Sequence, residues 1–278
     1  MIDDHAGPLV TIITPTLNQA AYIGETLRSV GEQTYPRIEH IVIDGGSTDG
    51  TLDILREWGG RWISEPDGGQ SDAINKGVAM ASGKVCAWLN SDDVYLTPDA
   101  VSVVVGVMRA GARAVTAGGW HLEPDGTPLA RIPVRSESLS ARALRRFDDV
   151  LQPATFYETS LARELPLDPS LRWTFDWDFF IRLAHRTPIV PLEHAIAGYR
   201  IQPDAKTQTG GRRRELELAR VQRRYSPWSP RLLLLQAIIA GRVAASFLPG
   251  ALQAFVVRVV NKVGRELDAR TGGIGIQP

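Results

Sequence analysis

In its first half the chain reads Val85-Cys-Ala-Trp-Leu-Asn-Ser-Asp-Asp93, an apolar run that ends in two adjacent carboxylates. The run predicts a buried strand, which would deliver Asp92 and Asp93 to the edge of a sheet. Bare carboxylates at that place suit a hard divalent cation, because such ions prefer oxygen ligands. The same pair could instead start an ordinary turn, as aspartate often does.

Around this run the sequence alternates between strand and helix patterns. Strands are predicted at 9–15, 39–44, 61–64 and 85–89, and helices at 20–33, 51–58 and 71–81. Helices between strands require crossover connections, so we expect an α/β fold with a mainly parallel sheet and helices on both faces. Ligands of such sheets bind beyond the carboxyl ends of the strands, where the polar loops would converge.

From about residue 97 the pattern loosens. It predicts a helix at 99–110, strands at 114–119 and 129–133 around a turn at 124–126, a helix at 175–185 and a strand at 189–201. Residues 134–175 give no clear pattern. A basic helix at 212–225 and a mostly apolar helical stretch at 231–263 follow a polar linker.

The charge of the chain is unevenly spread. The 278 residues have a formal net charge of zero, yet residues 1–204 carry 18 Lys/Arg against 27 Asp/Glu, and residues 205–278 carry 13 against 4. The basic tail could meet a membrane surface, a second subunit in a homodimer, or the acidic body itself. We expect no nucleic acid partner, because no recognised binding module accompanies the charge.

Two features that the sequence lacks help to predict the cellular location of the protein. The start of the chain lacks the pattern of a signal peptide, and no segment has 18 uninterrupted apolar residues, so we expect a cytoplasmic protein, peripheral at the inner face of the membrane if the tail binds lipid. The single cysteine, Cys86, allows no internal disulfide and lies in an apolar run, which predicts a buried, inert thiol.

Several loops offer groups that could hold a nucleotide. The Thr14–Asn18 loop provides N–H groups and hydroxyls, although it could equally be a plain turn with Asn18 as a cap. Asp44 could accept a hydrogen bond from a nucleobase, and Lys76 could approach phosphates, or both could be solvated. There is no GxGxxG and no P-loop lysine, which argues against a dehydrogenase or an NTPase.

Taken together, these segments closely resemble family 2 glycosyltransferases. The landmarks, in order, are Thr14-Pro-Thr-Leu-Asn18, Gln33-Thr-Tyr-Pro36, Ile43-Asp-Gly-Gly-Ser-Thr-Asp-Gly50, Ser71-Asp-Ala-Ile-Asn-Lys-Gly77 and Leu89-Asn-Ser-Asp-Asp93. The resemblance continues more faintly through Gln152-Pro-Ala-Thr-Phe156, Phe175-Asp-Trp-Asp178 and Tyr199-Arg200. It implies a GT-A fold, a Rossmann-like sheet that binds a nucleotide-sugar at its strand ends.

The resemblance also implies site residues. Asp44 matches the acid that contacts the base, and Asn90-Ser91-Asp92 matches an Asp-x-Asp metal motif in which Asn90 replaces the first acid. We therefore expect Mn²⁺ or Mg²⁺ at Asp92, with Asp93 beside it. The residues expected to bind the nucleotide-sugar are Thr14, Pro15, Thr16, Asn18, Asp44, Gly45, Asp72, Asn75, Lys76, Asn90, Ser91 and Arg200.

Asp176 matches the general base of the family, which takes the proton of an acceptor hydroxyl in a single, inverting displacement. Many relatives carry Glu before this Asp, where this chain has Phe175; Asp178 is the fallback. Relatives often place His two residues after the arginine that Arg200 matches, where this chain has Gln202.

The prediction is thus an inverting, metal-dependent hexosyltransferase with a saccharide, glycolipid or natural-product acceptor, of the type that builds bacterial polysaccharides. Residues 1–96 would form the nucleotide-sugar half, 97–205 the acceptor half with the base, and 206–278 a helical C-terminal extension. A nucleotidyltransferase and a GT-A scaffold without turnover are the alternatives.

Overall fold

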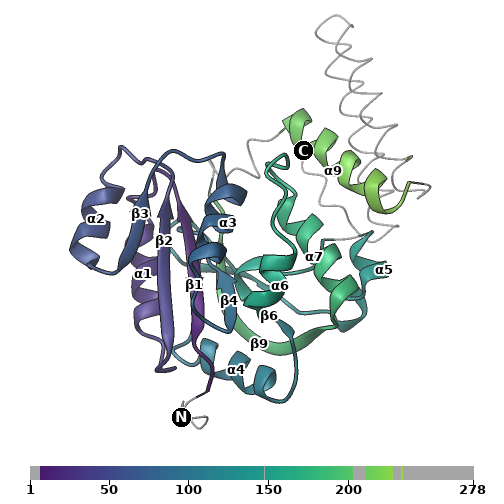
Figure 1. Cartoon of the computed structure of the whole chain (residues 1–278), viewed down its shortest axis with the longest axis horizontal. Coiled ribbons are helices and arrows are strands. Elements are labelled where there is room, and N and C mark those ends of the chain that lie inside the picture. Colours follow the sequence, from purple (N-terminus) through teal and green to yellow (C-terminus); the bar gives the residue numbers. More distant parts are fainter. Residues whose placement is uncertain (1–6, 147, 203–210, 228–232, 234–278) are drawn as a thin grey trace, which may run out of the picture.

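The computed structural model describes residues 7–146, 148–202, 211–227 and 233. The apolar stretch predicted at 231–263 therefore lies outside the described residues, apart from Leu233. The first half of the chain alternates strictly, as Figure 1 shows. Its elements are β1 (Val10–Thr16), α1 (Ile23–Gly31), β2 (Ile38–Asp44), α2 (Thr51–Trp58), β3 (Arg61–Ser64), α3 (Gln70–Met80) and β4 (Val85–Trp88). All seven were predicted, with bounds that differ by at most three residues.

The second half adds shorter and more varied elements. They are β5 (Val94–Tyr95), α4 (Ala100–Arg109), β6 (Ala114–Leu122), β7 (Pro128–Ile132), η2 (Ser136–Ser138), α5 (Ala141–Leu144), η3 (Gln152–Ala154), β8 (Thr155–Glu158), α6 (Thr159–Glu164), α7 (Phe175–Arg186), β9 (Ile189–Arg200) and α9 (Gly211–Tyr225). Strand β8 and helices α5 and α6 fall within residues 134–175, where no clear pattern was found, and strand β5 was not predicted.

One sheet connects the two halves. Among the described residues it has nine strands in the order β3-β2-β1-β4-β8-β6-β9-β5, with β7 paired to β6. The pairs β3·β2, β2·β1 and β1·β4 are parallel, as predicted, and so is β6·β9. β8 runs antiparallel to β4 and β6 and joins the parallel first half to the second half. Thr16 lies beside Asp44 and Asp44 beside Ser64, so the carboxyl ends of β1, β2 and β3 meet at one edge.

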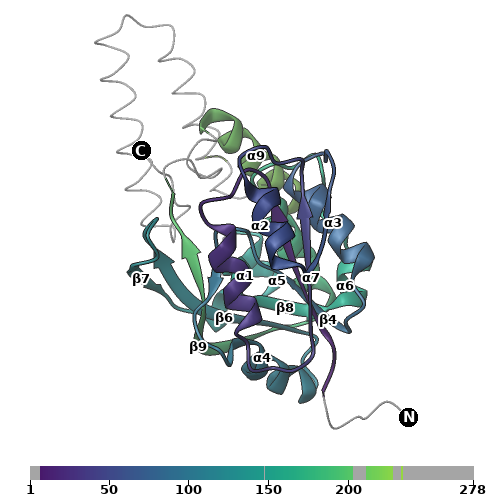
Figure 2. The same ribbon diagram turned by 90° about the vertical axis from the view of Figure 1, so that its left-hand side faces the viewer.

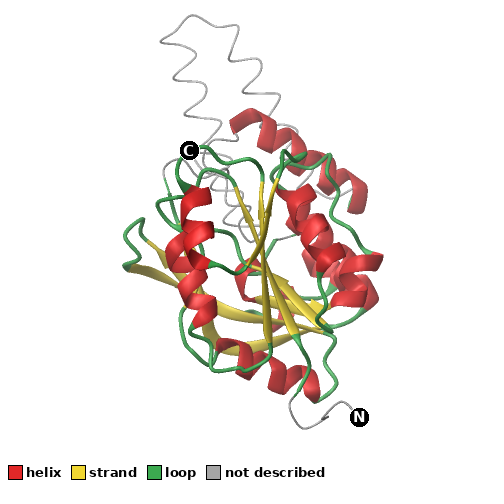
Figure 3. Ribbon diagram, turned by 60° about the vertical axis from the view of Figure 1, so that its left-hand side comes forward, coloured by secondary structure: helices red, strands yellow, loops and turns green. Residues whose placement is uncertain are grey.

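The core lies on both faces of this sheet, because successive side chains of a strand point to opposite sides. Ile13 of β1 packs in a cluster with residues of α3 and α7. Its neighbour Ile12 packs in a second cluster with residues of α4. Figure 3 shows helices on the two sides of the sheet, and Figure 2 shows β6, β7 and β9 extending it. Cys86 is buried, as predicted, and burial raises the pKa of its thiol to about 12.

The described part of the basic tail packs on the body. Helix α9 lies next to α7 in Figure 1, and its residues Val221, Leu218 and Tyr225 join the cluster that contains the buried face of α7. Within the described ranges, no helix is both long enough and apolar enough to cross a membrane.

Candidate active site

A cleft of about 1160 Å³ opens at the carboxyl ends of the parallel strands. Both halves of the chain contribute to its walls. The first half provides the loops after β1, β2, β3 and β4, and the second provides the segment before α7, the end of β9 and the start of α9. Of the predicted site residues, those lining the cleft are Pro15, Thr16, Gly45, Asn90, Asp92, Asp176 and Arg200.

The loops after β1 and β2 are bonded to each other. The backbone N–H of Asn18 donates to Ser47 Oγ at 2.7 Å, and the N–H of Thr48 donates to Asn18 Oδ1 at 2.8 Å. Asn18 adopts a positive φ of 53°, a conformation that asparagine tolerates better than most residues. Its role in the structure is therefore to join two loops beside the cleft, and it does not line the cleft itself.

Asp44 is fully buried at the end of β2. Its carboxylate accepts hydrogen bonds from the N–H groups of Gly46 and Ser47, both at 2.9 Å, from Ser64 Oγ at 2.6 Å, and from the Ser47 hydroxyl. These four bonds fix the turn that carries Gly45 to the edge of the cleft. Any hydrogen bond from Asp44 to a nucleobase would be made in addition to these four bonds.

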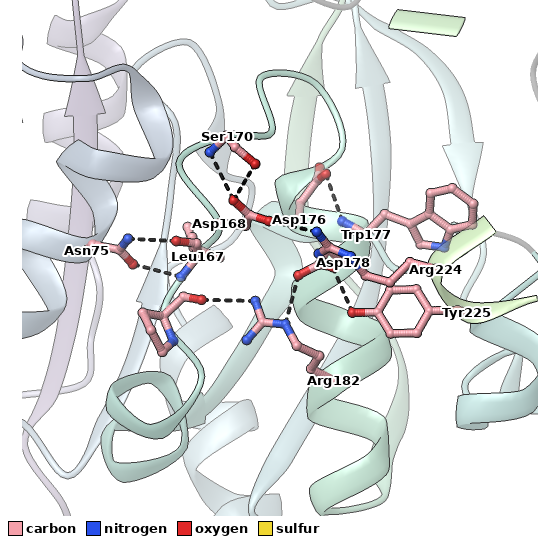
Figure 4. A network of polar contacts seen from close by, with 11 residues as sticks. Asn75, Leu167, Asp168, Ser170, Asp176, Trp177, Asp178, Arg182, Arg224 and Tyr225 are labelled. Atoms are coloured by element: carbon pink, nitrogen blue, oxygen red, sulfur yellow. Dashed lines mark hydrogen bonds and ion pairs between the residues drawn. The ribbon is translucent and has the colours of Figure 1, made fainter. Parts of the chain in front are cut away.

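The predicted residues on α3 lie behind the wall of the cleft. Asp72 accepts from the Gly68 N–H at 2.9 Å, and Lys76 Nζ lies 2.8 Å from Glu65 and 3.5 Å from Asp72. Asn75 makes two bonds of 2.9 Å with the backbone of Leu167, which ties α3 to the loop before α7 (Figure 4).

Thr14 and Ser91 do not reach the cleft either. Both are buried, and Thr14 Oγ1 lies 2.9 Å from His40 Nε2.

The two adjacent carboxylates after β4 have different surroundings. Asp92 lines the cleft and accepts from Gln202 Nε2 at 2.6 Å. Asp93 is 1% exposed and accepts from the Arg200 backbone N–H and from Asn90 Nδ2, each at 3.0 Å. Burial raises the pKa of Asp92, and burial followed by the neighbouring Asp92 charge raises the pKa of Asp93 well above its usual range. Asp92 is thus the carboxylate that faces the ligand space.

Arg200 lines the cleft, but its guanidinium is occupied within the protein. It donates to the backbone oxygens of Asp92 at 2.9 Å and Pro124 at 2.7 Å, and it pairs with Glu25. Its Cζ lies 5.1 Å from the centre of the Tyr22 ring. These contacts hold the end of β9 against the loop that carries Asp92.

The cleft suits a divalent ion that is shared with a ligand. Among the described residues no group of three or more His, Cys, Asp and Glu side chains could hold an ion by itself. Asp92 offers a single carboxylate. Mg²⁺ commonly binds through one or two carboxylates together with substrate phosphates, and it keeps several waters. A Mn²⁺ or Mg²⁺ ion therefore fits Asp92 when a diphosphate supplies the other oxygens.

Asp176 stands in the first turn of α7 and lines the cleft, and its Oδ1 accepts from the Trp177 N–H at 2.8 Å. Figure 4 shows how different Asp178 is. Asp178 is buried and accepts from Arg182 Nε at 2.8 Å, Arg224 Nη1 at 2.7 Å and Tyr225 Oη at 2.7 Å. The fallback base is therefore a structural acid that fixes α9 to α7.

Sequence reasoning missed several cleft residues. Arg172 and Trp173, before α7, and Arg213, on α9, line the cleft. Gln70 and Gln152 line it beside Asn90, to which both are hydrogen-bonded. Gln152 belongs to a quoted landmark, so its role could have been anticipated. The others follow only from long-range packing.

Comparison with known proteins agrees with this architecture. The structure is similar to S. aureus TarS 1–349 in complex with UDP-GlcNAc, with a TM-score of 0.63, 16% identity, and coverage of 95% of this chain and 92% of that one. It is also similar to the mannosyltransferase PcManGT of Pyrobaculum calidifontis in complex with GDP-Man and Mn²⁺, with a TM-score of 0.62, 18% identity, and coverage of 96% and 77%. The match to a longer chain of TarS covers 53% of that chain. The fold is that of the GT-A glycosyltransferases.

The sequence itself identifies the family. The model of glycosyl transferase family 2 matches residues 11–162, and the chain belongs to this family. It is 45% identical to an uncharacterized glycosyltransferase of Mycobacterium tuberculosis over 189 residues. This alignment covers 64% of this chain and 70% of the relative. It is 35% identical over 154 residues to the putative teichuronic acid biosynthesis glycosyltransferase TuaG of Bacillus subtilis, covering 52% and 58%. The family match ends before Asp176, Arg200 and α9.

Proposed function

We propose that this glycosyltransferase transfers a hexose from a nucleoside diphosphate sugar to an acceptor hydroxyl with inversion and with the help of a divalent metal. The observation that carries the proposal is that Asp92 and Asp176, which come from opposite halves of the chain, line the same cleft. One acid would serve the leaving diphosphate and the other the incoming hydroxyl. The similar structures with UDP-GlcNAc and with GDP-Man support a nucleotide-sugar donor.

Asp92 would hold the metal, and we assign this role to Asp92 alone, because Asp93 is occupied by Arg200 and Asn90. When bound, Mn²⁺ or Mg²⁺ would supply positive charge against the departing nucleoside diphosphate. The loops that contain Thr16 and Gly45, which line the same cleft as Asp92, would hold the nucleotide.

Asp176 would accept the proton of the acceptor hydroxyl while that oxygen attacks the anomeric carbon. The bond to the diphosphate breaks as the new glycosidic bond forms on the opposite face of the sugar, and this single displacement inverts the anomeric configuration. Trp177 would keep the Asp176 carboxylate in place through its backbone N–H.

The test is a panel of UDP-, GDP- and dTDP-sugars with Mn²⁺, followed by thermal shift and by release of the nucleoside diphosphate. We expect one donor to raise the melting temperature in the presence of metal, with this response lost in Asp92→Ala. Asp176→Asn should keep the thermal shift while release falls about 10²- to 10⁴-fold, the range for a lost general base. Asp53→Asn, on the exposed face of α2, should match the wild type.

Two alternatives predict other outcomes. A nucleotidyltransferase would release pyrophosphate, and it expects a basic, glycine-rich loop after the first strand, where this chain has Thr14-Pro-Thr-Leu-Asn18. A scaffold without turnover would show neither thermal shift nor release with any donor. Either result would refute the proposed transfer.

The remaining predictions concern the setting of the enzyme. We propose that residues 1–96 bind the donor, that residues 97–205 bind the acceptor and carry the base, and that residues 206–278 form a C-terminal extension. We further propose an acceptor in polysaccharide, glycolipid or natural-product assembly. A homodimer and a cytoplasmic position at the inner membrane face are proposals that involve the C-terminal extension, most of which lies outside the described part of the chain.

A further inference from the structure

A carboxylate on α9 binds the segment that leads into α7. Glu217 Oε1 accepts from the Trp173 N–H at 2.6 Å, from the Thr174 N–H at 2.8 Å and from Thr174 Oγ1 at 2.9 Å. Glu217 Oε2 accepts from the Arg172 N–H at 2.8 Å. Three consecutive backbone amides and one hydroxyl therefore converge on a single side chain that lies 43 residues beyond Thr174.

These bonds fix the residues directly before α7. Thr174 is the N-cap residue of α7, but its side chain makes no capping bond to the helix. A negative charge near a helix N-terminus is favourable, and hydrogen bonds to an ionised carboxylate are stronger than neutral ones. Glu217 thus places a carboxylate beside the start of α7 and binds the three residues that lead into it.

The segment that Glu217 binds carries the acceptor side of the cleft. Arg172 and Trp173 line the cleft, with Arg172 Cζ 5.7 Å from the centre of the Trp173 ring. Asp176 follows two residues after Thr174, in the first turn of the same helix. A shift of the 172–174 backbone would therefore move both the wall of the cleft and the carboxylate of Asp176.

Helix α9 has its own anchors, so Glu217 is not needed simply to keep α9 on the body. Arg224 pairs with Asp178 at 2.7 Å and with Asp168 at 3.1 Å, and the Tyr225 hydroxyl donates to Asp178 at 2.7 Å. These contacts come from the C-terminal end of α9 and reach Asp178 and Asp168, whereas Glu217 reaches residues 172–174. The two sets of bonds can be perturbed separately.

We propose that Glu217 is a positioning residue of the transferase: it fixes residues 172–174 and, through them, the place of Asp176 relative to the donor. This inference rests on the proposed role of Asp176 as the base. The family match ends at residue 162, and the inference makes α9 a part of the active site.

The test compares Glu217→Gln with Tyr225→Phe. In Glu217→Gln an amide NH₂ would face at least one of the backbone N–H groups, so donor would oppose donor, whereas Tyr225→Phe removes one anchor of α9 and leaves the Glu217 bonds intact. The first measurement is amide hydrogen exchange of a peptide that covers residues 169–178. We expect faster exchange at 172–174 in Glu217→Gln and wild-type exchange there in Tyr225→Phe.

The second measurement is metal-dependent hydrolysis of the UDP- or GDP-sugar that the wild type accepts, in which water takes the place of the acceptor. We expect kcat to fall about 10- to 100-fold in Glu217→Gln, as for other residues that orient a reacting group, with KM for the donor unchanged. Tyr225→Phe should keep both values. Glu217→Asp, which retains the charge, should recover part of the lost kcat, and it serves as the test variant if Glu217→Gln does not fold.

Unchanged exchange at 172–174, an equal loss of kcat in Tyr225→Phe, or a parallel change of kcat and donor KM would each overturn the inference. A wild type that hydrolyses no donor would instead refute the proposed function. The exchange result would then still decide whether Glu217 holds the segment.

Discussion

Replacing Asp92 and Asp93 one at a time should show that Asp92 binds the ligand and that Asp93 stabilises the fold. Asp93→Ala removes the acceptor of two hydrogen bonds, from the Arg200 backbone N–H and from Asn90, at a site that is 1% exposed. The buried Arg200 N–H left without a partner costs about 1–3 kcal/mol, while Asn90, which lines the cleft, keeps its bond to Gln152. The free energy of unfolding should therefore fall by about 1–3 kcal/mol, a sizeable share of the roughly 5–15 kcal/mol that stabilises a typical domain.

Asp92→Ala should behave in the opposite way. Its carboxylate faces the cleft and has Gln202 as its side-chain hydrogen-bond partner at 2.6 Å, and Gln202 also lines the cleft, where water can replace the lost acceptor. We expect its unfolding free energy to stay within about 1 kcal/mol of the wild type, while the metal-dependent response to donor disappears. Urea unfolding and a thermal shift with Mn²⁺ and donor measure the two effects.

The reasoning would be refuted by the reverse pattern: an Asp93→Ala variant as stable as the wild type that has lost the metal response. Such a result would mean that Asp93 turns toward the ligand and that its two bonds contribute little. The pair of variants is its own control, because the substitutions are identical and adjacent.

Three further outcomes follow from contacts elsewhere. Gly77→Ala should destabilise the fold by about 1–3 kcal/mol, because its Cβ would lie 2.4 Å from Ile13 Cγ2. Gly106→Ala should instead stabilise the fold by about 0.5–1 kcal/mol, because the new Cβ meets no other atom at this helical position. Urea unfolding of both variants measures the two effects. Burial lowers the pKa of His40 to about 3. Between this value and about pH 6.5 the unfolded chain binds a proton that the native protein does not, so stability is lost as the pH falls below about 6.5. The free energy of unfolding should therefore change less between pH 7 and pH 4 in His40→Gln than in the wild type, and an unchanged profile would contradict this. Asn75→Ala should speed proteolysis of the loop before α7, to which it makes two bonds of 2.9 Å; cleavage at the wild-type rate would count against that anchor.

The sequence predicted the first half of the fold well because strand and helix patterns alternate there regularly and polar, glycine-rich loops separate them. Helix α2 and strand β3 begin and end at the predicted residues. Strand β8 spans only Thr155–Glu158 and β5 only Val94–Tyr95. No regular alternation of strand and helix patterns surrounds these two segments, and their place in the sheet is decided by the strands beside them.

The site was predictable where chemistry lies in a local motif. Asp92 and Asp176 were singled out from short motifs, and both line the cleft. The distinction between Asp92 and Asp93 was not predictable, because it depends on Arg200, 107 residues away from Asp93. For the same reason nothing in the local sequence marks Glu217, which differs from other helical glutamates only in what it contacts after folding.

The bonds between the loops after β1 and β2 have a consequence for engineering. Asn18, Gln19 and Ala20 donate from their backbones to the side chains of Ser47, Thr51 and Asp49, and Asn18 Oδ1 accepts in return from Thr48. A chimera that imports one loop from a relative would lose these matched pairs, while one that imports both would keep them. Residues 16–20 and 45–51 therefore form a single exchangeable module, and attempts to change donor choice by grafting should move them together.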